Sequence, residues 1–385
     1  MHKTGRMKIA INCWVLRNKQ LDGIGYFTVN TFSRMISDHP ETEFLIMADK
    51  NFTDSYFDFP NVTIHRIFPP YRHPALYLAY METLVPLFLK KYRPDIFVSA
   101  EGFLSLISSC PQLPVIYDLN FEHFPENLPW KNRVYFRTFF KRFARKATRI
   151  ATISEYSKQD IVDLYKIPAD KIDNVSCGIN SSFRPLSVDE KQKAKNKFAK
   201  GKPYFFFVGS MHPRKNVHRL LLAFEKFKSS TNSEMNLVIA GAMLWSKSEI
   251  TDTYEQSRFK DDINFTGRLS DADLGTAIGG AYALTFVPVF EGFGLPIVEA
   301  FQAEVPVLAA NATSLPEVAG DAAVYADPFS VDSIAAGMES LYLNENDLVQ
   351  KLIANGRLQK NKFSWPNTAR LMWDCIQQAI SDTSR

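Results

Sequence analysis

Residues 283–299 read ALTFVPVFEGFGLPIVE, and this stretch says most about the fold. Its first five residues form a short apolar run that is typical of a strand buried inside a parallel sheet. A Gly-x-Gly turn follows at Gly292 and Gly294, and Pro296 suits the first turn of a helix. The stretch therefore predicts a strand, a close turn and a helix, which is the repeating unit of an α/β protein.

The same alternation of short apolar runs with helical patterns extends over the rest of the chain. Helical patterns cover residues 27–36, 76–91 and 217–227, and polar, helix-prone residues fill 184–203. Buried strands that alternate with helices predict parallel sheets covered on both faces. The other strand candidates are residues 8–12, 43–48, 64–67, 94–99, 114–118, 149–154, 204–209, 236–241, 263–267 and 305–309.

The length of the chain favours two domains, because 385 residues exceed what one hydrophobic core usually covers. The strand and helix pattern restarts after the polar segment 184–203, so we place the boundary near residue 185. We therefore expect an N-terminal domain at 1–185, a second α/β domain at 186–363 and a C-terminal helix at 364–385.

Composition narrows the classes of protein that fit. Apolar residues make up 46% and charged residues 22%, as in ordinary globular proteins. The net charge of +4 is too small for a dedicated nucleic-acid binder but suits anionic ligands or a membrane surface. The four cysteines are far apart, which predicts buried free thiols and no metal or disulfide framework. No apolar run is long enough for a membrane span, so we expect a cytoplasmic protein.

Residues 207–216, FVGSMHPRKN, are a candidate anion-binding turn. They follow a predicted strand and lead into a helix, with Asn216 as the expected N-cap. Helix N-termini attract anions, and Arg214 and Lys215 add two full positive charges, so a diphosphate would fit there. Fixed cations also stabilise a leaving diphosphate as its charge grows. A solvated basic turn is the alternative interpretation.

Two further elements suggest a ligand site. Glu291 and Glu299 flank the Gly-x-Gly turn, and their carboxylates can accept hydrogen bonds from sugar hydroxyls. For Glu299 the alternative is a surface carboxylate that compensates the helix dipole. Gly23 and Gly25 lie in the first predicted strand-to-helix turn, as a short glycine loop or as a purely structural turn.

Together these elements resemble the family 4 (group 1) glycosyltransferases, and the resemblance covers most of the chain. It implies a retaining enzyme with two Rossmann-like domains facing across a cleft (the GT-B type), whose last helix crosses back to the first domain. The motifs that carry it are 23–26 (GIGY), 117–121 (YDLNF) with Pro125, 208–216, 265–270 (FTGRLS) with Leu274, the E-x7-E pair at 291 and 299, 314–323 (SLPEVAGDAA) and 363–365 (FSW).

The resemblance also implies a role for each matching position. Arg214 and Lys215 would hold the diphosphate of a GDP- or UDP-sugar, and Glu299 would hold the ribose. Asp118, Arg214, Lys215 and Glu291 would form the catalytic set, without a metal ion or other cofactor. The donor-binding set would be Gly23, Gly25, Gly209, Arg214, Lys215, Gly267, Arg268, Leu269, Glu291, Gly292, Phe293, Gly294, Leu295 and Glu299.

One position departs from the family pattern. Many relatives have a histidine directly before the aspartate of the first-domain segment, whereas this chain has Tyr117. Tyrosine donates a hydrogen bond but carries no positive charge near neutral pH. Asp118 is therefore expected to make more of the acceptor contact, and His123 is interpreted as a loop residue.

The resemblance places Glu291 on hydroxyls of the transferred sugar and not beneath its anomeric carbon. We therefore expect front-face substitution, in which the departing phosphate oxygen takes the proton of the acceptor. The expected reaction moves a mannose- or glucose-type hexose to a glycan or lipid-linked acceptor, in polysaccharide or glycoconjugate synthesis. The alternatives are a nucleotide-sugar epimerase or phosphorylase of the same fold, or a non-catalytic subunit that binds a nucleotide sugar.

Residues 131–149 combine eight basic residues, no acidic residue and five aromatic rings. Such a helix could lie on an anionic membrane surface, which would suit a lipid-linked acceptor and a place at the inner face of the membrane. The alternative is a helix whose aromatic face packs on the core and whose basic face is solvated.

Overall fold

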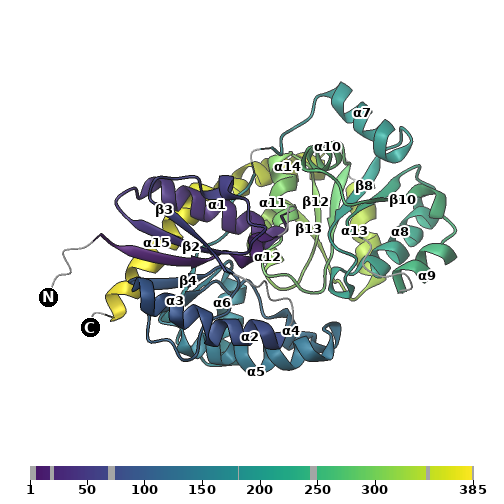
Figure 1. Cartoon of the computed structure of the whole chain (residues 1–385). Coiled ribbons are helices and arrows are strands. Elements are labelled where there is room, and N and C mark those ends of the chain that lie inside the picture. Colours follow the sequence, from purple (N-terminus) through teal and green to yellow (C-terminus); the bar gives the residue numbers. More distant parts are fainter. Residues whose placement is uncertain are drawn as a thin grey trace. The chain divides into compact units, whose positions relative to one another are not determined.

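The computed structural model describes residues 6–17, 21–67, 74–180, 182–242, 249–343 and 347–383. The chain folds into two compact units (Figure 1). Unit 1 comprises Met1–Gly178 and Ser364–Arg385, and unit 2 comprises Ile179–Phe363. The chain therefore leaves unit 1 at Gly178, a few residues before the expected boundary, and returns to it at Ser364.

Unit 1 contains a five-stranded sheet with the order β3-β2-β1-β4-β5, in which every pair of neighbouring strands is parallel. A bridge between Val115 and Ala151 continues it toward a second parallel pair, β6-β7. The strands are β1 (Lys8–Asn12), β2 (Glu43–Ala48), β3 (Val62–Arg66), β4 (Ile96–Ser99), β5 (Gln112–Pro114), β6 (Ile150–Thr152) and β7 (Ile172–Asn174).

Helices cover both faces of this sheet. One face shares a hydrophobic core with α2, α3 and α5, to which Phe97, Met81 and Phe143 contribute. The C-terminal helix α15 packs against α1 and contacts β4, β5 and β6, so the last helix belongs to unit 1 as the resemblance implied. The helices are α1 (Gly23–Asp38), α2 (Pro74–Glu82), α3 (Leu84–Tyr92), α4 (Asn120–His123), α5 (Trp130–Lys146), α6 (Glu155–Tyr165) and α15 (Trp365–Thr383).

Unit 2 contains a six-stranded, fully parallel sheet with the order β10-β9-β8-β11-β12-β13. Its strands are β8 (Tyr204–Val208), β9 (Asn236–Ala240), β10 (Ile263–Gly267), β11 (Ala283–Phe286), β12 (Val307–Ala310) and β13 (Ala323–Ala326). Its helices are α7 (Val188–Ala199), α8 (Val217–Thr231), α9 (Glu249–Gln256), α10 (Asp271–Gly279), α11 (Leu295–Gln302), α12 (Leu315–Ala319), α13 (Val331–Leu343) and α14 (Asp347–Gln359). The prediction of two α/β units built on parallel sheets is confirmed.

Three local predictions were wrong. The predicted helix 76–91 is two helices that part at Thr83, because Pro86 has no N–H for the carbonyl of Glu82 and its ring crowds that carbonyl. The first helix begins at Gly23 and not at residue 27, since Asp22 caps it by accepting from the N–H of Gly25 at 2.9 Å. The strand predicted at residues 114–118 is instead β5 at Gln112–Pro114, so it ends where the prediction began.

Candidate functional site

The candidate site of unit 2 lies where the order of its strands reverses. From β8 the chain proceeds to β9 and β10 on one side, and from β11 to β12 and β13 on the other. Loops that follow such neighbouring strands meet at the carboxyl edge of the sheet, where open α/β sheets bind ligands. Here the loops are the turn after β8, with a short 3-10 helix at Pro213–Lys215, and residues 287–294 after β11.

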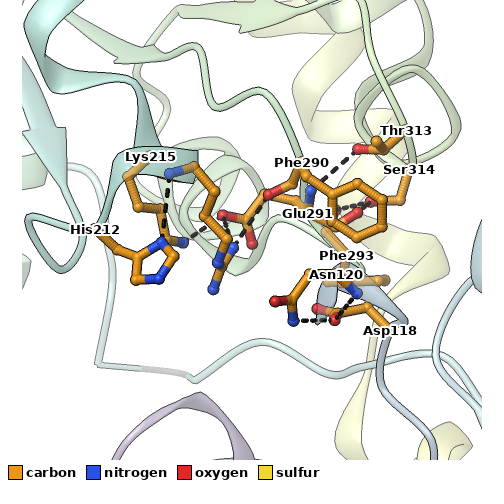
Figure 2. A network of polar contacts seen from close by, with 10 residues as sticks. Asp118, Asn120, His212, Lys215, Phe290, Glu291, Phe293, Thr313 and Ser314 are labelled. Carbon is orange, nitrogen blue, oxygen red and sulfur yellow. Dashed lines mark hydrogen bonds and ion pairs between the residues drawn. The ribbon is translucent and has the colours of Figure 1, made fainter. Parts of the chain in front are cut away.

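A carboxylate from one loop meets two cations from the other (Figure 2). Oε1 of Glu291 accepts a hydrogen bond from Nη1 of Arg214 at 2.9 Å and another from Nζ of Lys215. The backbones of the two loops are also joined, because the N–H of Val289 donates to the carbonyl of Arg214 at 2.9 Å. The structure thus brings together three of the four residues expected to be catalytic.

The carboxylate of this cluster is buried and remains charged, whereas its two cations are partly exposed. Glu291 is only 8% exposed. Burial by itself raises the pKa of Glu291, but the charges of Arg214 and Lys215 and their hydrogen bonds outweigh it and hold that pKa below its ordinary value. Two cations and one carboxylate leave a net positive charge, which suits an anionic ligand better than a neutral one.

Residues after β12 hold the Gly-x-Gly loop in place. Oγ of Ser314 lies 3.0 Å from the carbonyl oxygen of Glu291 and 3.1 Å from that of Phe293 (Figure 2). The N–H of Glu291 donates to Oγ1 of Thr313 at 3.2 Å. Gly294 has φ 104°, and a Cβ there would lie 2.6 Å from the side chain of Leu315, so both the backbone and the packing require glycine.

Asn216 has a different role from the expected N-cap. Its φ is 64°, in the left-handed region, and its side chain makes no capping hydrogen bond. Its Nδ2 instead donates to the carbonyls of Val287 at 2.9 Å and Pro328 at 2.7 Å. This fully buried side chain therefore ties the turn after β8 to the end of β11, a contact that the sequence pattern did not predict.

The residues expected to lie beside the nucleoside are at the ends of strands in the same sheet. A Cβ on Gly241 would lie 1.7 Å from the carbonyl oxygen of Gly209, so the two strand ends are in close contact. The N–H of Gly241 donates to the carbonyl of Gly267 at 2.9 Å. Arg268 is exposed and Leu269 is partly buried.

Glu299 lies in α11, just beyond its first turn. Burial raises the pKa of Glu299 to about 7, and the nearby carboxylate of Asp271 adds to the shift. A carboxyl group with this pKa can accept hydrogen bonds from a ligand and changes charge near neutral pH.

The remaining predicted residues lie in unit 1. Gly23 and Gly25 form the first turn of α1. Oδ1 of Asp118 accepts from the backbone N–H of Asn120 at 3.0 Å and from its side-chain amide (Figure 2). Burial raises the pKa of Tyr117 well above its ordinary value, and its hydroxyl donates to the carbonyl of Ala100 at 3.0 Å.

Unit 1 also contains His123 and the aromatic side chains of α5. His123 is at the end of α4, where its Nε2 lies 2.8 Å from Oδ1 of Asp160, so it joins α4 to α6. The aromatic side chains of α5 pack into the core through Tyr135 and Phe140, as the alternative interpretation required. Trp130, on the same helix, is 65% exposed.

The described residues contain neither a candidate metal site nor a candidate membrane span. Within those ranges, no group of three or more His, Cys, Asp or Glu side chains is placed to hold a metal ion. The expected independence from metals stays a prediction. Across the same part of the chain, no helix is long and apolar enough to cross a membrane.

Comparison with known proteins gives the same result for both halves of the chain. Residues 29–183 match the description "Glycosyltransferase Family 4", and residues 188–359 match "Glycosyl transferases group 1". The O-antigen chain mannosyltransferase B of Escherichia coli is 32% identical over 69% of this chain and 68% of its own length. The serotype-specific mannosyltransferase WbdA of Escherichia coli is 29% identical over 59% of this chain and only 28% of its own length.

A likeness to solved structures extends over almost the whole fold. The structure of HepE from Anabaena in complex with UDP-glucose has a TM-score of 0.75 and 14% identity, and the match covers 97% of this chain and 100% of that one. This likeness shows the two-unit, GT-B-type fold. With the two family matches and a relative that is 32% identical over two thirds of both chains, this chain belongs to the family 4 (group 1) glycosyltransferases.

Proposed function

We propose that this glycosyltransferase moves a mannose-type hexose from a GDP- or UDP-activated donor to a growing glycan or lipid-linked acceptor, with retention of the anomeric configuration. The names of the relatives, which are O-antigen and serotype-specific mannosyltransferases, support mannose and polysaccharide assembly. The UDP-glucose complex of HepE supports a nucleotide-sugar donor.

The observation that carries this proposal is the ion-paired cluster of Glu291, Arg214 and Lys215 at the reversal point of the unit 2 sheet. Arg214 and Lys215 hold the diphosphate, whose negative charge grows as its bond to the sugar breaks. Oε2 of Glu291 accepts from hydroxyls of the sugar while Oε1 keeps its contacts with the cations. Glu299, just beyond the first turn of α11, accepts from the ribose.

In this mechanism the bond between the anomeric carbon and the phosphate oxygen breaks as the acceptor oxygen attacks the same face. The acceptor's proton passes to the departing phosphate oxygen. Glu291 is ion-paired with both cations, which lowers its basicity and makes it a poor nucleophile. The two cations supply the charge stabilisation that a metal ion would otherwise provide, and no cofactor takes part.

The first test is a thermal-shift screen of nucleotides and nucleotide sugars. A ligand that binds only the folded chain stabilises it by mass action and so raises its melting temperature. At a ligand concentration of 100 Kd the free energy of unfolding increases by about 2.7 kcal/mol. We expect GDP- or UDP-hexoses and their diphosphates to stabilise the chain and adenine nucleotides to do so least. No stabilisation by any nucleoside diphosphate would contradict the proposal.

The proposal includes peripheral contact with the inner face of the membrane through α5. Its exposed side chains include the apolar Trp130 and Val134, 65% and 56% exposed, beside the basic Lys131, Arg142 and Arg145. We expect co-sedimentation with vesicles that contain phosphatidylglycerol and not with phosphatidylcholine alone. Val134→Asp should weaken it. The same change at Val188, which is 84% exposed in unit 2, is the control. Equal sedimentation with both vesicle types would exclude this contact.

A further inference from the structure

The sheet of unit 1 also reverses its strand order, and it does so between β1 and β4. From β1 the chain proceeds to β2 and β3 on one side, and from β4 to β5 on the other. Asn12 and Ser99 are the last residues of β1 and β4 and lie opposite each other in the register. Open parallel sheets bind ligands at such a reversal point, which in unit 2 carries the cluster of Glu291.

Three buried polar atoms at this point have no hydrogen-bond partner among the residues that the structure describes. They are Oδ1 of Asn12, Oγ of Ser99 and Oε1 of Glu101, which follows the end of β4 by two residues. Asn12 and Ser99 are fully buried, whereas Glu101 as a whole is partly exposed, so the group borders the surface. Because buried polar atoms are nearly always paired, three such atoms indicate a place for a ligand or water.

Tyr77 of α2 lies beside both Asn12 and Glu101. Nδ2 of Asn12 donates to the hydroxyl of Tyr77 at 3.4 Å, which leaves Oδ1 as the end of that amide without a partner in the described chain. Burial raises the pKa of Tyr77, and the carboxylate of Glu101 is close enough to add to the shift. The ring of Tyr77 stacks on Trp14 with centroids 4.7 Å apart, and the guanidinium of Arg17 lies 4.3 Å from the centroid of Trp14.

The chemistry of this group favours a neutral ligand with several hydroxyls. The amide oxygen of Asn12 and the ionised carboxylate of Glu101 only accept hydrogen bonds, so the ligand has to donate to both. Burial raises the pKa of Glu101 to about 7, although the charge of Arg17 and the N–H of Val15 act in the opposite direction. The same charge of Arg17 would repel a cationic ligand. A hexose, whose hydroxyls lie on neighbouring carbons, meets these requirements.

We propose that Asn12, Ser99 and Glu101 bind hydroxyls of the terminal hexose of the acceptor, with Glu101 making the strongest contact. This assignment rests on the proposed function and deepens it, since it names the side chains that recognise the acceptor. An ionised carboxylate forms a stronger hydrogen bond with a hydroxyl than a neutral oxygen does. Unit 2 then holds the donor at the reversal point of its sheet, and unit 1 holds the acceptor at its own.

The test uses two variants and a control, each in the full chain. Glu101→Gln keeps the shape of the side chain but removes its charge, and Ser99→Ala removes a hydroxyl that no described residue pairs with. Glu43→Gln is the control, because Glu43 pairs with Lys8 at 3.2 Å where β1 and β2 begin, at the opposite edge of the sheet. Methyl α-mannoside and methyl α-glucoside are titrated by saturation-transfer NMR, and GDP and UDP by calorimetry.

For the glycoside that wild type binds, we expect Glu101→Gln to raise the dissociation constant about tenfold, the typical effect of one hydrogen bond to a charged group. Ser99→Ala should raise it about threefold, because a neutral contact is lost. Neither variant should melt below the wild type at pH 8, since burial of the ionised Glu101 opposes folding and the Ser99 hydroxyl has no partner in the described chain. Glu43→Gln should bind the glycoside within twofold of wild type, and all variants should keep their diphosphate affinity.

Glycoside affinity of Glu101→Gln within twofold of wild type would overturn this assignment, and so would failure of the wild type to bind either glycoside. Diphosphate binding by the wild type would leave the proposed function intact in both cases. If Glu101→Gln melts far below the wild type, Ser99→Ala decides, and an unchanged glycoside affinity in that variant overturns the assignment. Failure of the wild type to bind GDP or UDP would overturn the proposed function and, with it, the identification of the bound hexose as an acceptor.

Discussion

Glu291→Gln is the substitution that separates the two roles proposed for Glu291. Glutamine has nearly the same shape and keeps an oxygen acceptor, but it has no charge to balance Arg214 and Lys215. Glu291 is 8% exposed in the wild type, and its carboxylate accepts hydrogen bonds from both cations. Removal of one partner from a buried ion pair destabilises a protein by about 3–5 kcal/mol. Because the amide keeps part of the hydrogen bonding, we expect a loss of about 2–4 kcal/mol.

Ligand binding should change in the opposite direction. In the wild type the Glu291 carboxylate competes with a diphosphate for the same two cations and repels it. Two unit charges about 6 Å apart interact by about 3 kcal/mol at an effective dielectric constant of 20. With allowance for screening, we expect Glu291→Gln to bind the nucleoside diphosphate about tenfold more tightly than the wild type. Turnover of the nucleotide sugar should fall about a hundredfold, since the charged contact with the sugar is lost.

The assay is calorimetric titration with the diphosphate, together with thermal unfolding and donor turnover, on Glu291→Gln and on a matched control. Glu304→Gln is that control, because Glu304 pairs with Arg357 at 2.6 Å on the surface, where the Arg357 side chain is 56% exposed. Such exposed pairs contribute at most about 1 kcal/mol. Weaker diphosphate binding by Glu291→Gln, or an unfolding temperature equal to that of the control variant, would refute this reasoning.

The remaining predictions concern single side chains of unit 2. Lys215→Ala should weaken diphosphate binding by titration at least tenfold, whereas Lys226→Ala, which removes a surface ion pair with Asp332, should not. Because the pKa of Glu299 is raised to about 7 in the folded chain, the ionised carboxylate destabilises the fold. The protonated carboxyl group therefore stabilises the fold fully below about pH 4.5, and this stabilisation is lost as the pH rises through 7. Glu299→Gln should therefore gain about 1–3 kcal/mol over the wild type in unfolding experiments at pH 8, but little at pH 4.5. Asn216→Ala should lower unfolding stability by about 2–4 kcal/mol, because two buried carbonyls lose their donor. A value under 1 kcal/mol would contradict the tie between its two loops.

The strands were the most predictable part of the fold. Residues 204–208 and 283–286 are strands because short, continuous apolar runs bounded by turn residues are typical of a buried parallel sheet. The start of α11 was equally clear, since Pro296 fits the first turn and Gly294 permits the left-handed backbone before it. Pattern and local chemistry agree at these positions.

The contacts within the site were not predictable from pattern. Glu291 meets Arg214 and Lys215 across 77 and 76 residues, and only the order of strands in the sheet places the two loops together. Asn216 looked like an N-cap because caps favour asparagine, but the same residue also tolerates a positive φ. The break at Thr83 had a visible signal in Pro86, which the helical periodicity of the flanking residues masked.

The most direct test of the central claim is the configuration of the sugar as the donor is consumed. The chain is incubated with the nucleoside diphosphate α-hexose that stabilises it best, with and without a glycan acceptor extract. Proton NMR then follows the anomeric signals from the first minutes. Front-face transfer at the Glu291, Arg214 and Lys215 cluster predicts that the first product carries the α configuration and that Lys215→Ala forms it far more slowly. A first product in the β configuration would contradict the account.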